Sequence, residues 1–365
     1  METNIDLVDY KTLSIQKKLF NDLNIDDPFF ESLKSDYDGF VDWFKKKGDA
    51  EAYVLLSDEE MIQAFLFLKI EDASENYEDI IPEFAPAKRL KVGTFKVSRG
   101  GQRLGERFLK IIFDNALYNN VEEIYVTVFD HRDEQKHLIS VLVEWGFIEY
   151  GIKNNGEKVF VRKINQPINL DNPKMTYPLV DFNKDTYIVP IYPDFHTNLF
   201  PDSILKTESP KNFVESFPHR NSIEKVFISR SLIRNLKKGD LIFFYRTKDG
   251  RTPAYYNAVV TTLGMVLEVV DDIPSESEFV QLCKNRSVFN ESELKEWWNR
   301  NPNHRPFIVK FLHIESLPKR PNRKELMKLN FVCLDEGPRG FVKMNKKEIT
   351  DLIEISELDK RIIKK

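Results

Sequence analysis

The chain has 365 residues, of which 41% are hydrophobic and 31% charged, with a formal net charge of −4 at pH 7. This length exceeds that of one ordinary domain and predicts two domains, each able to bury its own core. The two cysteines, Cys283 and Cys333, have no paired CxxC spacing, which argues against a disulfide framework and a thiolate zinc site.

The first residues, METNIDLVDYKTL, carry acidic side chains where a secretory signal has a basic and then an apolar run. Nor does any later stretch approach the roughly 18 consecutive apolar residues of a membrane span. We therefore expect a cytoplasmic protein with no membrane partner.

Charge divides the chain into two parts. Residues 1–165 hold 22 Lys and Arg against 31 Asp and Glu, a net charge of −9, whereas the remainder has a net charge of +5. Between the parts, INQPINLDNPKMTYPLVDFNKD contains three prolines and many Asn and Asp residues, which interrupt any regular period. We predict a first domain at 1–165, a linker at 166–184 and a second domain at 185–365.

Strands and helices alternate in the first domain. EAYVLLSDEEMIQAFLFLKIED predicts an antiparallel hairpin over about 52–57 and 61–71, after a helix in DGFVDWFKKKGD that ends at Gly48. The following apolar patterns predict a strand at 89–98, a helix at 105–119, a strand at 124–129, a helix at 134–147 and a strand at 157–164.

The stretch VSRGGQRLGERFL joins the strand at 89–98 to the helix that begins near Gly105. A glycine-rich turn into a helix leaves the first N–H groups unpaired at the positive end of the helix dipole, where an anion is stabilised. Arg99 and Arg103 could add positive charge. The stretch fits neither a Walker A motif nor GxGxxG, since it holds only Gly100, Gly101 and Gly105.

This order of elements, with GGQRLG at 100–105 and Gly146-Phe147 closing the last helix, resembles the GNAT N-acetyltransferase family over about residues 1–165. The resemblance implies that acetyl-CoA is the cofactor. It implies that the main chain of Phe95, Lys96 and Val97 receives the pantetheine arm, and that the neighbouring strand splays away to leave an acyl slot. The loop that it assigns to the pyrophosphate comprises Gly100, Gly101, Gln102, Arg103, Leu104 and Gly105.

The sequence departs from the family pattern at three positions. Gly100 stands where Arg or Gln is usual, and Arg103 stands where the middle glycine belongs, a position that Arg tolerates if its φ is negative. Leu142 occupies the place of a tyrosine that many members use as general acid. We expect the proton-transfer group instead among Asp130, His131 and Glu134, just beyond the strand 124–129, with His131 favoured by its ordinary pKa. The alternative is that the protein only positions the amine and uses no proton-transfer group.

The second domain contains short strands with aromatic and basic residues between them. Strands are predicted in DTYIVPIYPDF, KKGDLIFFYRTKDGR, AVVTTLGMVLEVVDD, HRPFIVKFLHIESL and GFVKM, and helices in ESELKEWWNR, KRPNRKELMKLN and NKKEITDLIEI. The phrase LKKGDLIFFYRTKDGR with the later GMVLEVV resembles the PUA-like group that includes ASCH and EVE domains, over about residues 185–355. That resemblance implies a small, partly open β-barrel with peripheral helices that binds RNA or a modified nucleotide. The fold class of the whole chain is then α+β.

Cations for phosphate and flat rings for stacking are what unpaired bases require. The residues predicted to contact RNA or a nucleotide are Tyr192, His196, Arg220, Arg246, Lys248 and Arg251. Phe243 and Tyr245 are expected to be core residues instead, and the Trp297-Trp298 pair is expected to anchor a helix.

Three functions remain open from the sequence. The first is an acetyl-CoA-dependent N-acyltransferase acting on RNA, a nucleotide or an RNA-linked amine such as aminoacyl-tRNA. The second is a non-catalytic acyl-CoA-binding or degenerate module whose barrel makes a regulatory contact with nucleic acid or protein, favoured by Leu142 and Arg103. The third is a hydrolytic barrel using Lys225 or Lys238 near Glu224.

Overall fold

The computed structural model describes residues 7, 15–57, 59–98, 103–203, 205, 217–248, 253–331 and 338–364. It divides into two compact units, with the boundary between Gln166 and Pro167. The segment 167–184, which the sequence analysis assigned to a linker, belongs to the second unit. There the hydroxyl of buried Tyr177 donates to the main-chain oxygen of His313 at 2.9 Å. Among the described residues, no helix is both long enough and apolar enough to cross a membrane.

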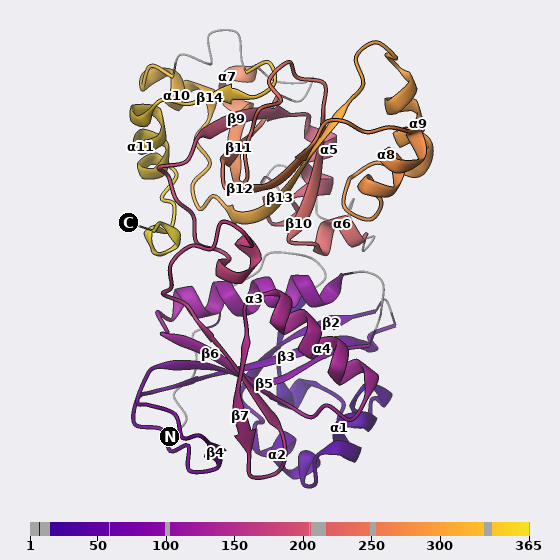
Figure 1. The fold of residues 1–365 in the computed structure, drawn as a ribbon. Helices are drawn as coiled ribbons and strands as arrows, with labels where there is room; N and C mark the ends of the chain where they lie inside the picture. Colours follow the sequence, from indigo (N-terminus) through magenta and orange to yellow (C-terminus); the bar gives the residue numbers. More distant parts are fainter. Residues whose placement is uncertain are drawn as a thin grey trace. The chain divides into compact units, whose positions relative to one another are not determined.

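The first unit is an eight-stranded mixed sheet in the order β1-β2-β3-β5-β6-β8-β7-β4 (Figure 1). Its elements are β1 (Ile15–Leu19), α1 (Glu31–Asp36), α2 (Phe40–Lys46), β2 (Glu51–Leu56), β3 (Ile62–Glu71), β4 (Ile80–Ile81), β5 (Arg89–Val97), α3 (Leu104–Tyr118), β6 (Glu123–Val128), α4 (Asp133–Glu144), β7 (Ile148–Lys153) and β8 (Lys158–Lys163).

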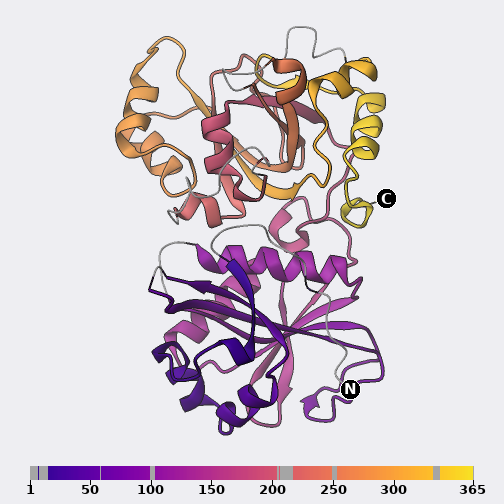
Figure 2. The same cartoon turned by 180° about the vertical axis from the view of Figure 1, so that it is seen from behind.

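Helices cover both faces of this sheet, as the two opposite views show (Figures 1 and 2). On one face, Asn115 of α3 donates to the hydroxyl of Tyr53 on β2 at 3.0 Å, and Phe108 packs on Phe95 of β5. On the other face, Phe30 and Phe44, from the segment that includes α1 and α2, pack around Phe65 of β3. We call these the α3 face and the α1 face.

The α3 helix forms because its apolar residues recur at helical spacing, so that one side of it is buried against the sheet. At the end of α4, Gly146 adopts a φ of 85°, a left-handed conformation that ends the helix at little steric cost. The predicted Gly146-Phe147 closure is therefore present, with Phe147 buried.

The second unit is built on a six-stranded mixed sheet in the order β10-β13-β12-β11-β9-β14. Its elements are β9 (Thr186–Ile191), α5 (Pro193–Leu199), α6 (Pro218–Asn221), β10 (Glu224–Ser229), β11 (Leu241–Arg246), α7 (Ala254–Asn257), β12 (Val259–Val270), α8 (Glu276–Cys283), α9 (Glu291–Asn299), β13 (Phe307–Ser316), α10 (Arg323–Lys328), β14 (Val342–Lys343) and α11 (Lys346–Ile355).

This second sheet curls around an aromatic core. Phe341, just before the edge strand β14, lies 5.9 Å from Phe227 on the opposite edge strand β10 and 6.1 Å from Phe307, measured between ring centroids. The two edges therefore share one core, as expected for a partly open barrel. Two mixed sheets with flanking helices confirm the predicted α+β class.

Removing a buried aromatic ring from α3 should destabilise the first unit strongly. Phe108 is fully buried, so Phe108→Ala leaves a cavity and should lower the free energy of unfolding by about 3–5 kcal/mol. Tyr118 lies at the end of the same helix with half of its surface exposed, and Tyr118→Ala should cost less than about 1 kcal/mol. Urea unfolding followed by circular dichroism measures both; equal losses would contradict the assigned orientation of α3.

Candidate functional site

The strands β5 and β6 pair with each other over only part of their lengths. Their parallel ladder runs from Arg89 opposite Glu123 to Val92 opposite Val126. Beyond that point β5 stays paired with β3 as far as Val97, and β6 stays paired with β8 as far as Val128. The two strands therefore part, and we call the gap between residues 93–97 and 127–128 the strand wedge. Such a separation between these two strands is what the resemblance of the sequence implies.

The cause of the separation is a β-bulge at Gly93. On β3, Phe67 opposes Thr94 while the next residue, Leu68, opposes Val92, so Gly93 is the extra residue. A bulge bends its strand and increases the local twist, which turns the rest of β5 away from β6. Any larger residue would force Phe67 to move, because a Cβ atom at this position would lie 2.7 Å from Cδ1 of Phe67.

The residues assigned to the pantetheine arm line one side of the wedge. Phe95 points to the α3 face, where its ring lies 6.0 Å from Phe108. Lys96 points to the α1 face, where its Nζ donates to the hydroxyl of Ser32 at 2.7 Å, and burial lowers its pKa. Together with Val97, both residues are only partly buried, and Gly93, which has no side chain, is exposed.

The helix α3 begins at Leu104, within the stretch 100–105 that is assigned to the pyrophosphate. Arg103 adopts a φ of 53°, so the condition of a negative φ is not met, and the residue has the left-handed conformation that favours glycine. Its guanidinium pairs with Glu106 at 2.6 Å. Leu104 is buried, whereas a Cβ atom at Gly105 would meet no described atom within 4 Å. Gly100, Gly101 and Gln102 lie outside the described residues.

On the α1 face, the segment 28–37 makes polar contacts with both sides of the wedge. Its Ser32 binds Lys96 of β5, as described above. At its other end, Asp36 accepts hydrogen bonds from Arg132 at 2.6 Å and from Gln135 at 3.0 Å, which belong to the start of α4. The ring of Tyr37 lies 5.3 Å from that of Phe129, just past β6.

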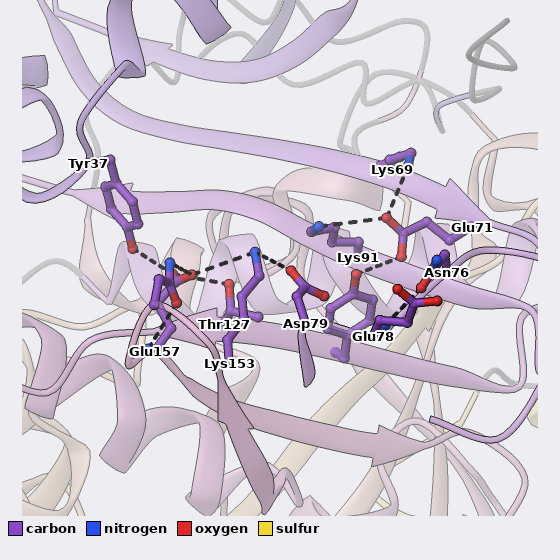
Figure 3. A network of polar contacts seen from close by, with 12 residues as sticks. Tyr37, Lys69, Glu71, Asn76, Glu78, Asp79, Lys91, Thr127, Lys153 and Glu157 are labelled. Atoms are coloured by element: carbon purple, nitrogen blue, oxygen red, sulfur yellow. Dashed lines mark hydrogen bonds and ion pairs between the residues drawn. The ribbon is translucent and has the colours of Figure 1, made fainter. Parts of the chain in front are cut away.

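A buried carboxylate, Glu157, lies beside the wedge on this same face (Figure 3). One carboxylate oxygen accepts hydrogen bonds from the hydroxyl of Tyr37 at 2.9 Å and from that of Thr127 at 3.1 Å. The other accepts from Asn155 at 2.9 Å and lies 4.0 Å from Nζ of Lys153. Burial and the negative charge of Glu157 raise the pKa of the Tyr37 hydroxyl. Glu157 is not among the site residues predicted from the sequence.

The three residues predicted to transfer protons lie where β6 leads into α4. His131 is exposed and stacks on Phe129 with 5.3 Å between ring centroids. Asp130 pairs with Lys158 at 3.3 Å, and Glu134 is exposed in the first turn of α4. Leu142, which replaces the family's tyrosine, is fully buried and therefore distant from solvent. The role of His131 stays a prediction.

In the second unit, a hydrogen-bonded chain of buried polar side chains connects two histidines. His196 contacts the hydroxyl of Thr261 at 2.8 Å, and Thr261 contacts that of Thr262 at 3.2 Å. The chain continues through Ser203 and Ser316 and ends at His313, with distances of 2.8, 2.8 and 3.3 Å. Burial, together with the charges of Arg246 and Arg320, lowers the pKa of His196 well below its ordinary value.

The structure separates the residues predicted to contact RNA by their exposure. His196 is fully buried and Arg246 is 3% exposed, so neither is presented as a surface contact for a base or a phosphate. Tyr192 is 69% exposed, and Lys248 is exposed at the end of β11. Arg220 is partly buried, with its guanidinium 3.5 Å from the side-chain oxygen of Asn198. Arg251 lies outside the described residues.

A second exposed aromatic group lies between α7 and α10. Tyr255 and Tyr256 are 37% and 55% exposed, and their rings meet edge to face at 5.0 Å. Nζ of Lys324 lies 5.7 and 5.4 Å from the two ring centroids. An exposed ring pair with an adjacent cation combines the groups that bind bases and phosphates.

The groups proposed for a hydrolytic barrel serve structural contacts here. Lys225 is fully buried, and its Nζ donates to the main-chain oxygen of His219 at 2.6 Å. Glu224 pairs with Lys174 at 2.7 Å and with Arg286 at 3.3 Å. Nζ of Lys238 donates to the main-chain oxygen of Asp171 at 3.1 Å. These contacts do not favour hydrolysis by this cluster.

Solved structures of two kinds are similar to parts of this chain. An ASCH protein of Zymomonas mobilis matches with 10% identity and a TM-score of 0.33, over 47% of this chain and 94% of its own. A GNAT-family acetyltransferase of Listeria monocytogenes matches with 15% identity and a TM-score of 0.30, over 43% of this chain and 98% of its own. One from Staphylococcus aureus matches with 11% identity and a TM-score of 0.30, over 42% and 100%.

No family model and no curated protein sequence matches the chain. The similar structures therefore include both kinds of domain that the sequence resembles, each over less than half of the chain. At these scores they carry no argument about activity, and the proposals below rest on the geometry of the chain itself.

The buried histidines of the second unit should make its stability depend on pH. Burial lowers the pKa of His219 to about 3 and holds that of His196 well below 6.5, so the unfolded chain binds more protons than the folded chain below pH 6.5. Stability is therefore full above pH 6.5 and falls as the pH is lowered. At pH 5.5 each histidine should cost about 1.4 kcal/mol.

Urea unfolding at pH 7.5 and 5.5, followed by tryptophan fluorescence, measures this loss. His219→Gln should remove about half of it, whereas substitution of the exposed His137 in the first unit should leave it unchanged. A pH dependence that is identical in all three proteins would show that these two histidines are not its origin.

Proposed function

We propose that the chain is an acetyl-CoA-dependent N-acyltransferase whose second unit binds RNA, a nucleotide or an RNA-linked amine such as aminoacyl-tRNA. The observation that carries the proposal is the strand wedge. It leaves main-chain groups of residues 93–97 available on the β6 side, next to the start of α3. A pantetheine arm carries amide groups that such a strand edge can bind, and a helix start stabilises a pyrophosphate.

Arg103 and Gly105 support the same placement. Arg103 holds the left-handed conformation at the position where the family pattern has glycine, so this residue adopts the backbone conformation that favours glycine although its side chain differs. Open space over Gly105 lets a ligand approach the main chain of the first helical turn closely. Transfer then requires a neutral amine held against the thioester carbonyl, for which orientation supplies much of the rate.

Two substitutions of Gly105 separate ligand binding from folding. Gly105→Ala adds a methyl group where no described atom lies within 4 Å and should raise helix stability by up to about 1 kcal/mol, yet weaken acetyl-CoA binding. Gly105→Glu should abolish binding, because a carboxylate there repels the pyrophosphate. Calorimetric titration with acetyl-CoA measures affinity, and Tyr118→Glu on the last turn of α3 is the control.

Unchanged affinity of Gly105→Glu would refute the pyrophosphate position. Acetyl-CoA at 100 times its Kd should stabilise the wild-type protein by about 2.7 kcal/mol. If the wild-type protein shows neither affinity for acetyl-CoA nor thermal stabilisation by it, the non-catalytic alternative is favoured instead.

For RNA, we propose the exposed tyrosine pair at 255 and 256 with Lys324, together with Tyr192 and Lys248, as the contact surface. Tyr256→Ala should cost about 1–3 kcal/mol of single-stranded RNA binding with little change in the salt dependence, because stacking is not electrostatic. Lys324→Gln should instead reduce the slope of log K against log salt by about 0.7, one phosphate contact. Filter binding of the full chain over a series of salt concentrations distinguishes the two effects, and the α9 variant Lys295→Gln is the control. If the chain binds no RNA at low salt, a protein partner is favoured instead.

A further inference from the structure

The two faces of the first sheet offer different surroundings to a molecule that enters the strand wedge. The helix start assigned to the pyrophosphate belongs to α3, which packs on the α3 face. A chain that runs from there between two parted strands presents its far end to the opposite face. If an acyl donor follows this path, its thioester lies toward the α1 face, where Thr127 and Tyr37 contact Glu157.

Thr127 is the first residue of β6 beyond its last parallel pair with β5, so its side chain borders the wedge directly. Its hydroxyl donates to Glu157, as does that of Tyr37. Both side chains are only partly buried, whereas Glu157 is 4% exposed. The two hydroxyls thus stand between accessible space and a buried carboxylate, and each retains oxygen lone pairs that can accept a hydrogen bond from an amine.

A comparison with a second buried carboxylate on the same face shows what is unusual about Glu157 (Figure 3). Glu71, 2% exposed, lies 3.1 Å from Nζ of Lys69 and 3.7 Å from that of Lys91, and accepts hydrogen bonds from the hydroxyls of Tyr77 and Tyr125. Its charge is balanced by two lysines. Around Glu157, three uncharged donors make the close contacts. Among the described residues the nearest cation is Lys153, whose Nζ is 4.0 Å from Glu157 and closer to Asp79, at 3.3 Å.

We propose that the α1 side of the strand wedge is the acceptor site for a primary amine, and that Glu157 takes the amine's proton through the hydroxyls of Thr127 and Tyr37. This inference rests on the proposed acyltransferase function and adds the group that prepares the acceptor. Glu157 acts through its two partners and is a positioning and proton-accepting residue rather than one that touches the thioester.

The proton balance of the step is complete. The ammonium form of the acceptor donates one proton to the hydroxyl of Thr127 or of Tyr37, and that hydroxyl passes its own proton to the Glu157 carboxylate. The neutral nitrogen then forms a bond to the carbonyl carbon, and the carbon–sulfur bond breaks. The second proton lost by nitrogen goes to the departing thiolate, so that the products are an amide and free CoA, and Glu157 releases its proton to solvent.

Two probe amines test this assignment with the full chain and acetyl-CoA. The ε-amine of Nα-acetyl-lysine methyl ester is protonated at neutral pH and must lose a proton before attack. Hydroxylamine is largely neutral at the same pH and needs no such step. Glu157→Gln should lower enzyme-dependent CoA release with the lysine ester by about 10²–10⁴-fold and change that with hydroxylamine much less.

Two further variants keep the test valid if Glu157→Gln fails to fold. Thr127→Val and Tyr37→Phe remove one hydroxyl each and preserve side-chain size, and each should reproduce part of the lysine-specific loss. Glu149→Gln, on β7 and 55% exposed, is the matched control and should behave as wild type.

Other outcomes overturn the proposal in distinguishable ways. Equal losses with both probes assign Glu157 a purely structural role, and a lysine-specific loss in His131→Ala but not in Glu157→Gln assigns the proton to His131. Wild-type protein that binds acetyl-CoA but accelerates neither probe would show that the α1 side is not an amine site. Failure to bind acetyl-CoA in calorimetry refutes the proposed function itself.

Discussion

The extra residue at Gly93 is the feature on which the first unit's proposed chemistry depends. A sheet whose strands pair along their whole length offers no main-chain groups in its interior to a ligand, because each N–H and C=O is already bonded. The bulge separates β5 from β6 without disrupting the sheet, since each strand keeps its other partner. A central gap is thus obtained in a sheet that remains rigid on both sides.

The rigidity of the two walls matters for the reaction. Residues 94–97 are held by β3, Thr127 is held by β8, and the segment 28–37 is tied to both sides through Lys96 and through Glu157. Each contact alone contributes about 1 kcal/mol, but together they fix the distances between groups from distant parts of the chain. An acyl donor and an amine held between such walls react faster, because their relative orientation is already fixed, which a flexible cleft does not provide.

Much of the first unit could be predicted from sequence because its pattern is local. The hairpin at 51–71, the helix after the glycine loop and the helix that ends before Gly146 all show apolar periodicity within one element. The short edge strands β1 and β4 are harder to predict, since a few residues carry little periodic signal.

Glu157 illustrates why a site is harder to predict than a fold. It follows the turn-rich KNNG, where a glutamate normally faces solvent, and its partners Tyr37 and Thr127 lie 120 and 30 residues away in sequence. Only the assembled sheet brings them together. Composition alone likewise suggested that His196 and Arg246 face a ligand at the surface, whereas the curl of the second sheet buries both. A signal that could have been used is the mixture of small hydroxyl residues on the adjacent strand, in VVTTLG.

The same kind of irregularity marks the polar chemistry of the second unit. Between Phe244 and Tyr245 the pairing of β11 with β12 shifts by one residue, and Thr261 is the residue left without an opposing partner. Its hydroxyl reaches His196 in the barrel interior, where a regular strand would place an apolar side chain.

Buried hydroxyls and a neutral histidine weaken the unit relative to an apolar core of the same shape, particularly at low pH. The chain from His196 to His313 pairs several of these groups with one another, whereas Nδ1 of His196 is buried with no hydrogen-bond partner among the described residues. Where the groups do pair, their hydrogen bonds fix the relative orientation of the side chains, which apolar packing alone does not do. In both units, then, a single extra residue in one strand determines where polar groups enter the sheet.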